Sequence, residues 1–114
     1  MIKQAGFISM LLFAVPALAD HGGLPRPGEP VVIDVRTGGE YRQGHVREAV
    51  NIPYDEIAQR IAAFAPDRDA RIVLYCRSGR RSGIAEQTLR QLGYGRIENK
   101  GSLDDMRREG YRTD

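Results

Sequence analysis

The 114-residue chain contains one cysteine, Cys76, and the residues that follow it suit a nucleophile. They form a short polar stretch that is rich in arginine: Arg77, Ser78, Gly79, Arg80, Arg81 and Ser82. The reactive form of a cysteine is its thiolate, which nearby arginines and backbone N–H groups stabilise. The same positive charge attracts an anionic substrate. The pattern therefore predicts a cysteine nucleophile inside an anion-binding loop.

Two elements are expected to position this loop. Ile72–Tyr75 is apolar, β-branched and aromatic, which is typical of a buried strand. A helix is expected behind the loop, with Ser82 as its N-cap and Gly93 just after its end. Residues at helical spacing give that helix its apolar face: Ile84, Ala85, Thr88, Leu89 and Leu92. A strand that enters a helix through a tight loop directs N–H groups and the positive end of the helix dipole into the loop.

The rest of the chain alternates between strand and helix patterns. Further strands are expected at Val31–Asp34, Ala49–Ile52 and Arg96–Glu98. Helices are expected after Thr37, whose side chain can form a capping box with Glu40, at Asp55–Ala65 and around Leu103 and Met106. Such alternation predicts a parallel sheet with helices on both faces. Sites in these sheets lie at the carboxyl ends of strands, where Asp34 and Cys76 both fall.

The loop Cys76–Ser82 resembles the C-x-x-G-x-R-S active-site loop of the rhodanese family of sulfurtransferases. Upstream segments match the family's pattern in order: Ile33–Arg36, Glu40-Tyr41, Gly44–Val46 and Ala49–Pro53. Leu92–Tyr94 also matches, so the resemblance extends over about 31–106. Within the family, the chain is similar to an exported, single-domain type. Two departures affect the rim of the site: Gly101-Ser102 stands where many relatives have two glycines, and Glu48 where a glycine is common.

The resemblance implies an α/β rhodanese-like fold with a parallel sheet of about five strands and helices on both faces. It implies that Cys76 takes the outer sulfur of thiosulfate and passes it to a thiophilic acceptor such as cyanide or a thiol, with no metal or organic cofactor. The loop residues 77–82 would hold the persulfide and the anionic donor. We expect Asp34 and Arg36 to support the site, with Arg36 and a carboxylate tying loops together near it, and His45 to be structural.

Two other functions are weighed against this one. A cysteine phosphatase has a C-x5-R loop with its arginine six positions after the cysteine, whereas Ser82 occupies that position and Arg81 comes one residue early. Phosphatase or arsenate chemistry is therefore disfavoured. A persulfide carrier or partner-binding module without turnover would retain the same residues, and the sequence does not separate it from an enzyme.

The N-terminus predicts export. Lys3 is followed by an apolar run and then Ala17-Leu18-Ala19, the pattern of a cleaved secretory signal peptide at residues 1–19. Residues 20–30 are rich in glycine and proline and predict a flexible tether before a domain at 31–114. The expected location is the periplasm, without a membrane anchor, as a monomer or weak homodimer. The formal net charge of +2 argues against nucleic-acid binding.

Overall fold

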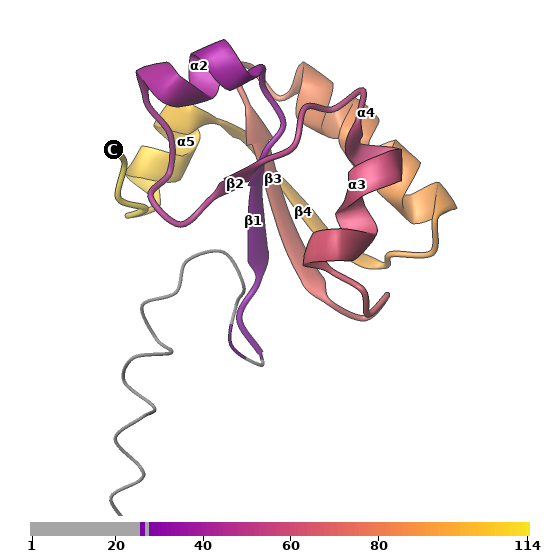
Figure 1. Cartoon of the computed structure of the whole chain (residues 1–114). Helices are drawn as coiled ribbons and strands as arrows, with labels where there is room; N and C mark the ends of the chain where they lie inside the picture. Colours follow the sequence, from indigo (N-terminus) through magenta and orange to yellow (C-terminus); the bar gives the residue numbers. More distant parts are fainter. Residues whose placement is uncertain (1–25, 27) are drawn as a thin grey trace, which may run out of the picture.

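Four parallel strands form the sheet at the centre of the structure, in the order β2-β1-β3-β4 (Figure 1). The structure is a computed structural model that describes Arg26 and residues 28–114. The strands are β1 (Val31–Asp34), β2 (Val50–Asn51), β3 (Arg71–Cys76) and β4 (Arg96–Ser102). The parallel α/β sheet is as expected, but the expectation of about five strands is wrong for the described residues. The C-terminal segment makes only a single antiparallel bridge, between Thr113 and Val46, rather than a further strand.

The two central strands, β1 and β3, have apolar side chains on both faces. All of β1 is buried, and so is β3 from Ile72 onward. Their register places Ile33 beside Leu74 and Asp34 beside Tyr75. Strands covered on both sides consist of nearly continuous apolar residues, and this is why both runs are recognisable in the sequence.

Helices cover both faces of the sheet (Figure 1). In chain order they are α2 (Gly38–Gln43), α3 (Ile57–Phe64), α4 (Arg80–Gln91) and α5 (Leu103–Arg108). Ile61 of α3 and Leu89 of α4 belong to the core cluster on one face, whereas Met106 of α5 belongs to the cluster on the other. In Figure 1 the strands run upward, so their carboxyl ends meet at the top, where α2 and the first turn of α4 lie.

Helix α4 begins earlier than the sequence predicts. Ser82 was expected to be its N-cap, but the N-cap is Gly79, in the left-handed conformation at φ 94°, and Ser82 lies buried in the first turn. Because glycine adopts a positive φ without steric cost, the chain turns into the helix directly after Ser78. The expected end is confirmed: Gly93 follows the helix at φ 99°.

The apolar face of α4 also differs from the expected one. Ala85 and Leu89 are fully buried, but Ile84 and Leu92 are 37% and 36% exposed. The early start of the helix places buried Ser82, rather than an apolar residue, on the face toward the sheet in the first turn. On the other side of α4, Glu86 and Arg90 form an i,i+4 ion pair, with 2.8 Å between the charged groups.

The two outer strands differ in length from the predicted ones. β2 has two residues instead of the expected Ala49–Ile52, and it stops at Asn51 because β1, its partner in the sheet, ends opposite it at Asp34. β4 continues to Ser102 instead of ending at Glu98, because an irregularity in the pairing with β3 lets Cys76 lie opposite Ser102. That continuation brings the end of β4 beside the cysteine.

Most of the residues to which the N-terminal predictions apply are not described by the structure. The expected signal peptide, 1–19, lies outside the described residues, as does the expected tether except for Arg26 and residues 28–30. The first strand begins at Val31. Among the described helices, none has the length and apolar character needed to cross a membrane.

Candidate active site

Cys76 is the last residue of β3, and its side chain is fully buried. Only three residues separate it from α4, so the first turn of the helix wraps around the sulfur. The backbone N–H of Gly79 donates a hydrogen bond to Sγ over 2.9 Å, and the hydroxyl of Ser82 lies 3.4 Å from Sγ. The sulfur therefore sits among donors at the amino end of a twelve-residue helix, which favours a negative charge there.

The tight loop depends on two glycines that approach each other. A Cβ at Gly79 would lie 3.5 Å from the Cα of Gly101, and both residues have a positive φ of 94°. A Cβ at Gly101 would come within 2.5 Å of the carboxylate of Asp105. The positive φ favours glycine at both positions, and at Gly101 the Asp105 carboxylate also leaves no room for a side chain.

These contacts lower the pKa of the Cys76 thiol below its ordinary value. Burial by itself would raise this pKa, because it disfavours the charged form. The hydrogen bonds from the Ser82 hydroxyl and from the backbone N–H groups of Ser82, Ser78 and Gly79 outweigh that penalty. The site therefore increases the fraction of Cys76 present as the nucleophilic thiolate.

Asn99 on β4 contacts the loop from the side, and the sequence pattern does not indicate this role. Its Oδ1 accepts hydrogen bonds from the Ser82 hydroxyl, at 2.7 Å, and from the N–H of Gly101, at 3.0 Å. Its Nδ2 donates to the carbonyl of Gly79 over 3.2 Å. The amide orientation is self-consistent, since a flipped amide would place like groups together on both sides. Its position two residues before Gly101, at the carboxyl end of a strand, was the one available signal.

Ser82 has one hydroxyl proton and three acceptors within reach. Its Oγ lies 2.7 Å from Asn99 Oδ1, 3.1 Å from the carbonyl oxygen of Gly79 and 3.4 Å from Cys76 Sγ. A hydroxyl can rotate to suit whichever acceptor is most negative. The proton can therefore turn to the sulfur when the sulfur is charged, while the Gly101 N–H continues to satisfy Asn99.

The three loop arginines have different surroundings. Arg81 forms a two-pronged ion pair with Glu40 of α2, with distances of 2.8 and 3.0 Å. Arg77 is 80% exposed, and its Nη1 lies 3.9 Å from the same carboxylate. The Arg80 side chain is exposed and makes no ion pair or hydrogen bond with the rest of the described chain. The sequence places these arginines together, but it does not show that one of them is paired.

Asp34 and Arg36 form a buried network with Tyr75. Arg36 donates to both carboxylate oxygens of Asp34, its Nη2 lying 2.6 Å from Oδ2, and also donates to the carbonyl of Gly44. The Tyr75 hydroxyl donates to Asp34 over 2.8 Å and accepts from the N–H of Val46 at 3.0 Å.

This network lies on the other side of the sheet from the sulfur. Tyr75 and Cys76 are consecutive in β3, and their side chains belong to different core clusters. Asp34 and Arg36 therefore brace the carboxyl ends of the strands without a hydrogen bond to Sγ. His45 is also held structurally: its ring stacks on Tyr41 at 3.6 Å between centroids, and its Nδ1 lies 2.7 Å from the Tyr41 carbonyl oxygen.

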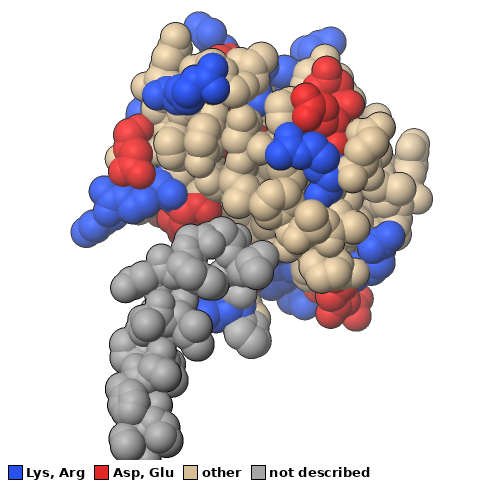
Figure 2. Space-filling model, viewed as in Figure 1, with Lys and Arg blue, Asp and Glu red and all other residues tan. Residues whose placement is uncertain are grey.

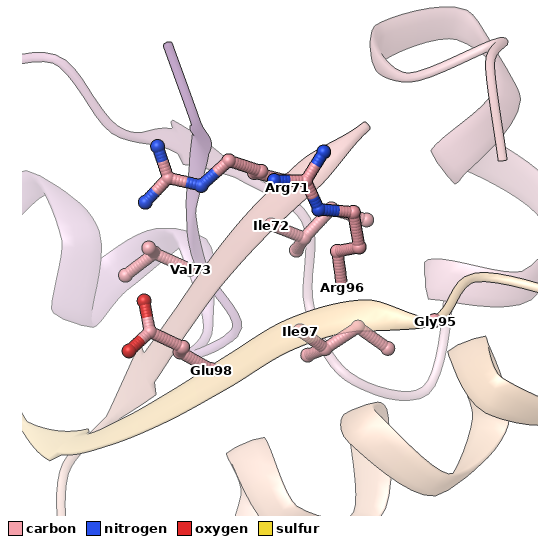
Figure 3. Close-up of a pocket in the computed structure, with 7 residues that line it drawn as sticks. All are labelled: Arg71, Ile72, Val73, Gly95, Arg96, Ile97 and Glu98. Carbon is pink, nitrogen blue, oxygen red and sulfur yellow. The ribbon is translucent and has the colours of Figure 1, made fainter. Parts of the chain in front are cut away.

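A separate hollow of about 280 Å³ lies away from the cysteine (Figure 3). It is lined by the first residues of β3 and β4, Arg71–Val73 and Arg96–Glu98, and by Gly95, which precedes β4. The strands are parallel, so this hollow lies at the amino ends of the strands, whereas Cys76 lies at the carboxyl end of β3. Within the described part of the chain, no three His, Cys, Asp or Glu side chains are grouped as metal ligands.

Comparisons with known proteins agree with this geometry. The family model for the rhodanese-like domain matches residues 21–106. The chain is 37% identical over 107 residues to thiosulfate sulfurtransferase PspE of Escherichia coli, covering 93% of each chain. It is 40% identical over 81 residues to a sulfurtransferase of Allochromatium vinosum, covering 70% of this chain and 74% of that protein. A solved structure of a rhodanese with anions from E. coli superposes with a TM-score of 0.70 at 38% identity, covering 75% of this chain and 98% of that one.

Proposed function

This chain belongs to the rhodanese-like domain family, and on that basis we propose that it is a thiosulfate sulfurtransferase with Cys76 as its nucleophile. The observation that carries the proposal is the position of the Cys76 sulfur, buried at the end of β3 with the Gly79 N–H and the Ser82 hydroxyl directed at it. An anionic sulfur is the species that this arrangement stabilises. The relatives at 37% and 40% identity are both named as sulfurtransferases.

In the first step, the Cys76 thiolate attacks the outer sulfur of thiosulfate. A bond forms between Sγ and that sulfur, and the original sulfur–sulfur bond breaks. Sulfite leaves with the bonding pair, and a Cys76 persulfide anion remains, so no oxidant or reductant is needed. The N–H groups that lower the pKa of the Cys76 thiol are the donors available to hold the terminal sulfur of the persulfide.

In the second step, a thiophilic acceptor removes the sulfur. Cyanide attacks the outer sulfur of the persulfide, leaves as thiocyanate and returns Cys76 to the thiolate, while a thiol acceptor would become a persulfide itself. The chain has no second cysteine to relay the sulfur. Both half-reactions therefore take place at one atom, and ping-pong kinetics are expected.

The donor is an anion, and the exposed arginines of the loop are suited to attract it. The side chains of Arg77 and Arg80 are exposed on the loop that follows Cys76, and Arg81 ties this loop to α2 through its ion pair with Glu40. Elsewhere, on the face shown in Figure 2, the Lys and Arg side chains are interspersed with Asp and Glu.

The test uses intact mass and turnover together. Exposing the purified protein to thiosulfate should add the mass of one sulfur atom, and cyanide should remove that mass and yield thiocyanate. Cys76→Ser should do neither, whereas Thr88→Ala, a change on α4 outside the loop 77–82, should do both. Many thiocyanate molecules per protein indicate an enzyme, and a single one indicates a carrier. Thiocyanate formation by Cys76→Ser at the parent rate would refute the nucleophile assignment.

The proposed location follows from the N-terminal pattern. Residues 1–19 act as a signal peptide that is cleaved after Ala19, and the protein is released to the periplasm. The support is the order of Lys3, an uncharged apolar run and Ala17-Leu18-Ala19. Reaction at a single thiol suits an oxidising compartment, because no second cysteine in the chain is present to trap it in an intramolecular disulfide.

A further inference from the structure

The carboxylate of Glu40 lies among the loop arginines but comes from a different part of the fold. Glu40 belongs to α2, which follows β1, whereas the arginines follow β3. Its two oxygens accept from Arg81 at 2.8 and 3.0 Å, and Oε2 lies 3.9 Å from Nη1 of Arg77. One negative charge therefore stands beside two of the three positive charges at the entrance to the sulfur site.

The position and the charge of Glu40 are fixed by its own helix. Thr37 and Glu40 form a capping box, in which the N–H and the hydroxyl of Thr37 lie 3.0 and 3.1 Å from Oε1. The hydrogen bond from Arg81 is the largest effect on the pKa of Glu40, and it lowers this pKa. Burial acts in the opposite direction, but with the further hydrogen bonds from Thr37 the pKa of Glu40 falls to about 2. The carboxylate is consequently ionised at every pH at which a thiolate enzyme works.

The charge of Arg81 acts on the sulfur, and Glu40 opposes it. The pKa of Arg81 is raised first by its hydrogen bond to Glu40, against burial, and also by the charges of Glu40 and of Cys76. Such an interaction is reciprocal, so Arg81 stabilises negative charge at Cys76 to the same extent. Arg80, without an ion pair among the described residues, contributes its full charge.

From this arrangement we infer that Glu40 is a specificity-determining residue, which limits the positive charge at the entrance and so reduces the preference for doubly charged sulfur donors over singly charged ones. The inference rests on the proposed sulfurtransferase function and adds a statement about which donors that site accepts. Glu40 does not touch the donor. It acts by partly cancelling the field of Arg81 and Arg77, which the donor crosses on its way to Cys76.

The size of the effect follows from Coulomb's law. For a donor about 10 Å from the carboxylate in water, removing one negative charge should favour a dianion about fourfold and a monoanion about twofold. The difference should shrink with added salt, because the screening length is about 10 Å at 0.1 M ionic strength. The measurement should therefore be made at about 10 mM salt and repeated at about 0.3 M.

Glu40→Gln isolates the charge from the fold. Glutamine retains the capping box, since its side-chain oxygen can still accept from Thr37, and it can still accept one hydrogen bond from Arg81. Glu86→Gln is the matched control, because it changes the net charge of the protein by the same amount. Glu86 also forms an ion pair with an arginine, Arg90, but further along α4. Any general effect of net charge should appear in both variants.

The first measurement compares kcat/KM for thiosulfate, a dianion, with kcat/KM for methanethiosulfonate, a monoanion that delivers sulfur in the same way. Glu40→Gln should raise the first about fourfold and the second about twofold at low salt, and Glu86→Gln should leave the ratio unchanged. An unchanged or lower ratio in Glu40→Gln would overturn the inference, and so would an equal rise in Glu86→Gln.

The second measurement does not depend on sulfur transfer. Cys76 is alkylated with iodoacetate, an anion, and with iodoacetamide, which is neutral and of similar size. The ratio of the two rate constants should rise about twofold in Glu40→Gln and remain constant in Glu86→Gln. If the parent protein fails to take sulfur from thiosulfate, the proposed function is wrong, but the alkylation ratio still decides the role of Glu40. A constant ratio in Glu40→Gln would refute that role.

Discussion

Replacing Ser82 with alanine should raise the pKa of Cys76 and so make it a weaker nucleophile at pH values below that pKa. The Ser82 hydroxyl lies 3.4 Å from Sγ, and its hydrogen bond is the first of the contributions that lower the pKa of Cys76 against the opposing effect of burial. Alanine removes this donor and keeps the backbone N–H groups. Asn99 loses one partner but retains the Gly101 N–H at 3.0 Å, so the surrounding hydrogen bonds are largely preserved.

The expected magnitude follows from the strength of one hydrogen bond to a charged group. Such bonds contribute about 1.5–3 kcal/mol, and the long distance to sulfur places this one at the low end. A change of about 1.4 kcal/mol is a factor of ten in an equilibrium constant, so the thiolate fraction at pH below the pKa should fall about tenfold. In Ser82→Ala the cost of burying the thiolate remains, and fewer hydrogen bonds offset it. The pKa of Cys76 is therefore higher in the variant than in the parent.

The assay is the rate of alkylation of Cys76 by iodoacetamide as a function of pH. The midpoint of the profile should lie at higher pH in Ser82→Ala than in the parent, and the rate at any pH below both midpoints should be about tenfold lower. Thr88→Ala is the control, because it also removes a hydroxyl from α4, but that hydroxyl donates to the carbonyl of Ile84 and not to Sγ. If Ser82→Ala matches the parent profile as Thr88→Ala does, the hydroxyl of Ser82 does not stabilise the thiolate and the reasoning is refuted.

Two further predictions concern the fold and the N-terminus. Tyr75→Phe should lower the free energy of unfolding by about 1–3 kcal/mol, because the buried N–H of Val46 loses its acceptor; chemical denaturation measures this, and Tyr54→Phe, whose hydroxyl makes no hydrogen bond within the described chain, should change it little. Sulfur transfer by folded Tyr75→Phe should match the parent, and a slower rate at unchanged stability would contradict the purely structural role of this hydroxyl. For export, N-terminal sequencing of the protein from the periplasmic fraction should begin at Asp20, and a mature protein that begins at Met1 would show that residues 1–19 are not cleaved.

The sequence alone determined the features that depend on neighbouring residues. The strands at Val31–Asp34 and Ile72–Tyr75 are recognisable because burial on both faces requires continuous apolar runs. The capping box of Thr37 and Glu40 and the helix end at Gly93 involve residues at most a few positions apart. The cysteine and its loop could be singled out for the same reason, since the donors that surround Sγ come from the next six residues.

The tertiary structure decided what lies next to that loop. Glu40 pairs with Arg81 across 41 positions of sequence, and Asn99 reaches Ser82 across 17. These contacts depend on the strand order, which brings α2, the start of α4 and the end of β4 to one edge of the sheet. The local pattern shows three arginines beside a cysteine, but the charge that a donor meets there depends on which residues the fold places around them. Electrostatic fields act through space, and sequence spacing does not set those distances.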